Sequence, residues 1–115
     1  MSAHNRFRVG ARHGRDRLIL ELQGELDMAS AHLLDETLAG ASPKDSCEAV
    51  VLDLAGVQFA DSTGLKAIFR ARKTVLDQGL RFAVTESSPQ VQRLLKLTRL
   101  DEHLETIEAP ESELG

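Results

Sequence analysis

The sequence contains few aromatic residues, a single cysteine and no long apolar segment, and each shortage disfavours a class of protein. Of the 115 residues four are phenylalanine, and tryptophan and tyrosine do not occur. Proteins that bind single-stranded nucleic acid stack bases on exposed rings, so this mode of binding is disfavoured. The single cysteine, Cys47, cannot form an internal disulfide. The lack of an apolar secretory core and of any run near membrane-spanning length predicts a cytoplasmic protein without membrane insertion.

The net charge of -4 disfavours nucleic acid as the main partner, because binding to phosphates requires a clustered basic surface. The charge is also unevenly distributed. Arginines crowd residues 6–17, whereas residues 101–113 contain acidic side chains and no lysine or arginine. We interpret both regions as solvated ends. The length suits a single domain over residues 1–115, with an ordered core at about 6–108 and a frayed acidic tail at 109–115.

Apolar periodicity predicts strands that alternate with helices along the chain. Strands are expected at residues 7–11, 18–23, 49–54, 80–85 and 104–108, the first two joined as a hairpin by a turn at 13–16. Helices are expected to start at Ser30, Gly64 and Ser88, with the Ser30 hydroxyl capping the first and Gly79 ending the second. The nearly continuous apolar run at 49–54 is typical of a central strand covered on both faces. Strand–helix–strand units imply parallel pairing through right-handed crossovers.

The segment Asp61-Ser62-Thr63-Gly64 places two hydroxyls between a buried strand and the start of a helix. A helix N-terminus presents unpaired N–H groups and a partial positive charge, which favour a phosphate. A phosphate on Ser62 would add about -1.5 to -2 charges beside the carboxylate of Asp61, so the modified state would be locally repulsive. A surface that fits a partner when neutral would then reject it. Taken alone, however, these residues are more often an ordinary helix cap and tight turn.

Other catalytic arrangements are missing from the sequence. The four histidines are scattered without metal-ligand spacing, no serine lies in a Gly-x-Ser-x-Gly elbow, and no Gly-x-x-x-x-Gly-Lys-Ser/Thr phosphate loop occurs. We interpret Asp53 as a residue at the end of a strand rather than as part of a carboxylate cluster. The sequence therefore predicts no catalytic residue, no metal site and no cofactor, and we do not expect an enzyme.

Three segments in this order and spacing resemble the STAS domains, which are shared by sulfate transporters and anti-sigma factor antagonists. They are residues 24–27 with Ala31, residues 50–65, and residues 88–100. The resemblance extends roughly from Phe7 to Ile107. It implies an α/β fold of the STAS type, with a mixed β-sheet of four to five strands and helices packed mainly on one face.

The resemblance to the antagonists also implies a mechanism. The unphosphorylated protein would bind an anti-sigma factor that is also an ATP-dependent serine kinase, and this binding would release the sigma factor. Phosphorylation by the kinase would switch the protein off, and a metal-dependent serine phosphatase would reverse it. Carried onto this chain, the resemblance implies that Ser62 is the phosphoacceptor. The switch and partner surface would comprise Asp27, Asp61, Thr63, Gly64, Leu65 and Lys66.

Two residues depart from the family pattern, and other roles stay open. Lys66 and Arg99 stand where the family often has glycine. The lysine is expected to alter the partner contact or to attract phosphate, and the arginine to change how the third helix ends.

The alternative to a free-standing antagonist is a subunit of a larger sensory or lipid-transport assembly. A nucleotide-binding enzyme is a third hypothesis, which the missing phosphate loop disfavours.

Overall fold

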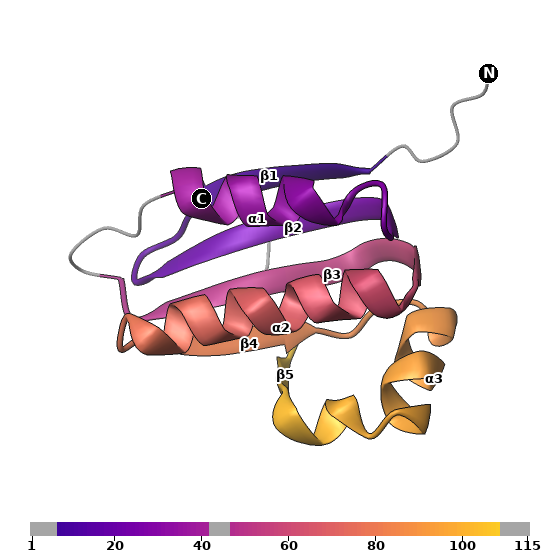
Figure 1. The fold of residues 1–115 in the computed structure, drawn as a ribbon. Helices are drawn as coiled ribbons and strands as arrows, with labels where there is room; N and C mark the ends of the chain where they lie inside the picture. The colour runs from indigo at the N-terminus through magenta and orange to yellow at the C-terminus, as the bar shows by residue number, and fades with distance from the viewer. Residues whose placement is uncertain (1–6, 42–46, 109–115) are drawn as a thin grey trace.

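A computed structural model describes residues 7–41 and 47–108, which form a five-stranded sheet and three α-helices (Figure 1). The strands are β1 (Arg8–His13), β2 (Arg17–Leu26), β3 (Ala49–Ala60), β4 (Arg81–Thr85) and β5 (Glu105–Ile107). The helices are α1 (Ala31–Gly40), α2 (Ser62–Asp77) and α3 (Pro89–Leu97), followed by a short 3₁₀ helix, Leu100–His103. The tail that the sequence predicts to be frayed, residues 109–115, lies outside the described residues.

The strands follow one another across the sheet in the order β1-β2-β3-β4-β5. Strands β1 and β2 are antiparallel, and the backbone N–H of Gly14 donates to the carbonyl of Arg17 (2.8 Å) to close the predicted hairpin. The pairs β2–β3, β3–β4 and β4–β5 are parallel. This arrangement confirms the predicted mixed sheet. Because β2 and β3 are parallel, both end at the same edge, where Leu26 pairs with Ala60.

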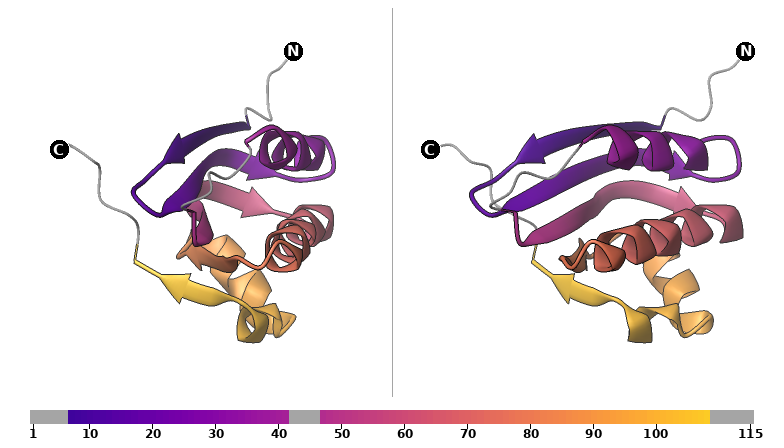
Figure 2. Two further views of the ribbon diagram at one scale, coloured as in Figure 1. Left: turned by 90° about the vertical axis from the view of Figure 1, so that its left-hand side faces the viewer. Right: turned by 60° about the vertical axis from the view of Figure 1, so that its left-hand side comes forward.

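Helices α1 and α2 cover one face of the sheet (Figure 2). Alternate residues of the strands, among them Leu20 of β2 and Leu52 of β3, point into the core on this side, where they meet Leu34 of α1 and Ile68 of α2. Apolar residues at every second position of a strand share one face, so the alternation in the sequence produces this core. The helices therefore lie mainly on one face, as predicted.

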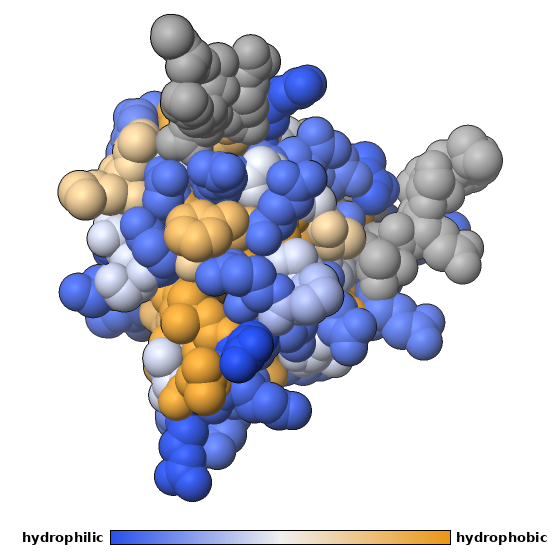
Figure 3. Space-filling model, turned by 90° about the vertical axis from the view of Figure 1, so that its right-hand side faces the viewer, coloured by the Kyte–Doolittle hydropathy of each residue, from blue (hydrophilic) through white to orange (hydrophobic). Residues whose placement is uncertain are grey.

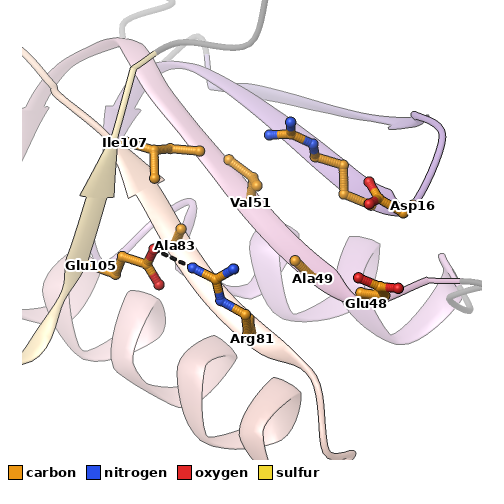
Figure 4. A pocket seen from close by; sticks show the side chains of 9 residues that line it. Asp16, Glu48, Ala49, Val51, Arg81, Ala83, Glu105 and Ile107 are labelled. Carbon is orange, nitrogen blue, oxygen red and sulfur yellow. Dashed lines mark hydrogen bonds and ion pairs between the residues drawn. The ribbon is translucent and has the colours of Figure 1, made fainter.

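The second face of the sheet has no helix over it within the described residues (Figure 2). Val51 is nevertheless only 1% exposed on that side. It lies in the floor of a pocket that is also lined by Arg81, Glu105 and Ile107 (Figure 4). Long charged side chains bury their aliphatic stems on apolar surface and keep their charges in water. The predicted burial of the run at 49–54 on both faces is therefore confirmed at Val51, whereas Ala49 and Asp53 are only half-buried.

Strand β3 is longer than predicted, because it continues beyond residue 54 to Ala60. The register between β2 and β3 shifts twice along this extension. A Cβ at Gly56 would lie 3.0 Å from the carbonyl oxygen of Leu22, so the absence of a side chain permits the close pairing. Residues 55–58 include small and polar side chains that interrupt the apolar alternation, so the sequence pattern does not predict this part of the strand.

The helix ends follow local signals. The hydroxyl of Ser88 accepts from the backbone N–H of Val91 (3.4 Å), and Gly79 ends α2 with φ 81°, both as predicted. Arg99 follows the end of α3 with φ 63°, the only positive φ outside glycine among the described residues. The left-handed conformation costs a residue with a side chain about 1 kcal/mol. Arginine at this position therefore adopts a conformation that glycine adopts more easily.

Candidate functional site

The loops that follow β2 and β3 lie side by side at one end of the molecule (Figure 1). The backbone N–H of Asp61, which follows β3, donates to the carbonyl of Leu26 at the end of β2 (3.3 Å). The loop from β2 to α1 and the first turn of α2 thus form one surface. In sheets with parallel strands, such carboxyl-terminal edges commonly bind ligands.

The carboxylate of Asp61 connects the two loops. Its Oδ1 accepts from the backbone N–H of Gly64 (2.8 Å), which caps α2, and its Oδ2 accepts from the backbone N–H of Met28 (3.3 Å). A capping side chain of this kind contributes about 1 kcal/mol to stability. Sequence analysis predicted Asp61 as a charge beside Ser62. The bond to Met28 shows that Asp61 also links two loops that lie 33 residues apart in the sequence.

Ser62 is the first residue of α2, and its side chain is exposed. Within the described residues its hydroxyl makes no hydrogen bond, because Asp61 supplies the cap. Thr63 is half-buried, and Lys66 is exposed one turn further along the helix. The free hydroxyl therefore lies at the start of a helix on a surface that other proteins can reach.

Gly64 and Leu65 lie beneath this surface. A Cβ on Gly64 would lie 2.0 Å from the carbonyl oxygen of Leu26, a distance that non-bonded atoms do not reach. Glycine is thus required where α2 crosses the end of β2. Leu65 is only 3% exposed and packs in the core. Both residues position the surface from below and present no side chain to a partner.

The loop from Asp27 to Ser30 is held by its own hydrogen bonds. Oδ1 of Asp27 accepts from the backbone N–H of Ala29 (3.0 Å). The Ser30 hydroxyl donates to the carbonyl of Glu25 (2.7 Å) and accepts from the backbone N–H of Asp27 (3.0 Å). Ser30 precedes α1, but its side chain makes no bond to that helix, so the predicted cap is wrong. The hydroxyl stabilises the loop instead.

Exposed apolar side chains accompany the polar residues at this end. Met28, at the tip of the loop, is 75% exposed, and Phe59 near the end of β3 is also exposed. Figure 3 views this end of the molecule and shows hydrophobic areas between hydrophilic ones. Sequence analysis missed both residues. The available signal was that Met28 lies between the expected strand and helix, and that Phe59 follows the apolar run at 49–54.

Comparison with known proteins identifies the family. A model of the STAS domain matches residues 9–113. The chain belongs to the STAS domain family. A protein named anti-sigma F factor antagonist from Paenibacillus polymyxa is 34% identical to this STAS domain over 94 residues, which cover 82% of this chain and 80% of the relative. The anti-sigma-F factor antagonist RsfB of Mycobacterium tuberculosis is 32% identical over 101 residues, which cover 88% and 81%.

A solved structure confirms the fold of the STAS domain. The crystal structure of an anti-sigma factor antagonist from Mycobacterium paratuberculosis superimposes with a TM-score of 0.76 at 26% identity. The match covers 92% of this chain and 89% of that one. The predicted resemblance is therefore confirmed for nearly the whole described sheet and its helices.

A further hollow of the STAS domain lies away from the loops that follow β2 and β3. The pocket on the helix-free face of the sheet, with a volume of about 180 Å³, contains an Arg81–Glu105 ion pair above apolar residues (Figure 4). The described residues include no group of three or more histidine, cysteine, aspartate or glutamate side chains that could hold a metal ion. Within the same residues, no helix is long and apolar enough to cross a membrane.

Proposed function

We propose that this STAS domain is an anti-sigma factor antagonist whose binding to an anti-sigma factor is switched off by phosphorylation of Ser62. The observation that carries this proposal is the exposed Ser62 hydroxyl, which makes no hydrogen bond within the described residues and stands where two loops meet. Two relatives named as antagonists of anti-sigma factors, each aligned over most of the chain, support the choice of partner.

In the unphosphorylated state the partner surface combines polar and apolar side chains. Ser62, Thr63 and Lys66 face outward from the first turns of α2, with the loop of Asp27 and Met28 beside them. The exposed side chain of Met28 supplies apolar area that a partner can bury, and Ser62 adds no charge while it is unphosphorylated. By occupying the anti-sigma factor, the protein releases the sigma factor. The chain acts as a cytoplasmic, single-domain binding module and not as an enzyme, and it requires no cofactor.

Phosphorylation changes the charge of this surface. The anti-sigma factor, acting as a serine kinase, transfers the γ-phosphoryl group of ATP to Ser62 Oγ, ADP leaves, and the hydroxyl proton passes to a base of the kinase. The new dianion stands next to Asp61, whose oxygens accept backbone N–H groups at 2.8 and 3.3 Å. Added negative charge at an interface opposes docking by repulsion and by its desolvation cost. A metal-dependent phosphatase restores the hydroxyl by hydrolysis.

The proposal is tested with the cognate anti-sigma factor and labelled ATP. Wild-type protein should incorporate one phosphate, Ser62→Ala should incorporate none, and Thr63→Ala should still be labelled because the acceptor is intact. Equal labelling of the wild type and Ser62→Ala would refute the assignment of the site. Unphosphorylated protein should bind the anti-sigma factor, and the phosphorylated form should bind at least tenfold more weakly.

A further inference from the structure

Lys66 differs from the other cations on the exposed face of α2. Arg70 pairs with Asp35 of α1 (2.9 Å), and Lys73 pairs with Asp77 one turn away (3.1 Å). Lys66 is exposed and makes no hydrogen bond or ion pair within the described residues. Its ammonium group is therefore available to a new anion near the start of the helix.

The spacing between residues 62 and 66 places their side chains together. Residues four apart lie on the same face of a helix, with Cβ atoms about 6 Å from one another. The pairing is more favourable when the anion precedes the cation in the sequence, which is the order here. On the other side of Ser62, the carboxylate of Asp61 repels a phosphate and already accepts two backbone N–H groups. Repulsion by Asp61 and attraction to Lys66 thus both favour a position of the phosphate that is turned toward Lys66.

On the basis of the proposed function, we infer that Lys66 is the residue that pairs with the phosphate on Ser62. Phosphorylation then makes two changes to the partner surface at once. It adds a dianion, and it engages the ammonium group of Lys66, which makes no ion pair within the described residues. Lys66 is a positioning residue in this account, because it holds the phosphate over the first turn of α2 and away from the loop of Met28.

The inference is tested on the full chain with phosphoserine incorporated genetically at position 62, so that no kinase is needed. The second pKa of the phosphate, ordinarily near 6, is read from a ³¹P titration. A nearby cation favours the dianion, so the pKa should be lower in the wild type than in Lys66→Gln by about 0.3 unit. Lys66→Arg should restore most of the shift, and added salt should reduce it because both groups are exposed.

Lys73→Gln is the matched control. Residue 73 lies on the same face of α2 as residue 62, but roughly 16 Å further along the axis, beyond the screening length of physiological salt. Its loss should leave the pKa of the phosphate unchanged, and the N–H groups at the helix start are the same in all variants. An equal phosphate pKa in the wild type and Lys66→Gln would overturn the inference. Failure of the proposed function appears separately, as a wild-type protein that does not bind the anti-sigma factor.

Discussion

Helices α1 and α2 both begin at the same edge of the sheet, each beside a serine, but the two serines are used in opposite ways. Ser30 is 3% exposed, and its hydroxyl donates to the carbonyl of Glu25 in β2 and accepts from the backbone N–H of Asp27 in the loop. Ser62 is exposed and its hydroxyl makes no bond within the described residues, because Asp61 caps the helix. Because Asp61 does the capping, the Ser62 hydroxyl stays available for the proposed phosphorylation, whereas the Ser30 hydroxyl is used to hold a loop.

The largest effect is expected where α2 approaches β2. Gly64→Ala should lower the free energy of unfolding by about 3 kcal/mol, because its Cβ would overlap the carbonyl of Leu26. Gly40→Ala in α1 is the control, since a Cβ there meets nothing within 4 Å. Urea denaturation measures both. If the two substitutions had equal effects, the close crossing of α2 over β2 would not exist.

The two serines themselves provide the next comparison. Ser30→Ala should cost about 2 kcal/mol, because it leaves the carbonyl of Glu25 and the N–H of Asp27, both partly buried, without their partner. Ser62→Ala should change stability by less than about 0.5 kcal/mol. Thermal unfolding of the two variants gives the comparison directly. A Ser62→Ala variant as unstable as Ser30→Ala would mean that the Ser62 hydroxyl is structural.

Removal of the cap on α2 should have a smaller effect. Asp61→Ala should lower the free energy of unfolding by about 1 kcal/mol, through loss of the bonds to Gly64 and Met28. Asp61→Asn retains an acceptor oxygen for Gly64 and should recover part of the loss. Chemical denaturation reports the stability, and amide exchange at Met28 and Gly64 reports each bond. Unchanged exchange at Met28 in Asp61→Ala would argue against the link between the loops.

The smallest effect is expected from the ion pair that joins the exteriors of α1 and α2. Arg70→Ala removes its bond to Asp35, but both side chains are substantially exposed, so the loss should be at most about 0.5 kcal/mol. The double variant with Asp35→Ala completes a mutant cycle in urea. A coupling above 1 kcal/mol would show that the two helices are held together from outside as well as through the core.

Local signals predict much of this fold. The turn at Gly14, the cap at Ser88 and the left-handed Gly79 depend on residues a few positions apart, so the sequence reveals them. The alternation of β2 and β4 likewise predicts which residues face the helices. The family resemblance directs attention to Ser62, which composition and spacing alone would leave as an ordinary helix start.

The parts that were missed depend on contacts distant in sequence. The second half of β3 is held by pairing with β2 across two register shifts, although its own apolar pattern is weak. The bonding of Ser30 is decided by the path of its loop, since the same residues are equally compatible with a helix cap. The requirement for glycine at 64 arises only because β2 ends directly beneath α2.

The crossing at Gly64 sets limits for protein engineering. Variant libraries that aim to redirect this domain to a new target should hold residues 64 and 65 fixed, since one permits the crossing and the other packs in the core. Diversity belongs at Met28, Thr63 and Lys66, whose side chains face outward to different extents. Recognition can thus be rewritten on the exterior while the geometry around residue 62 is preserved.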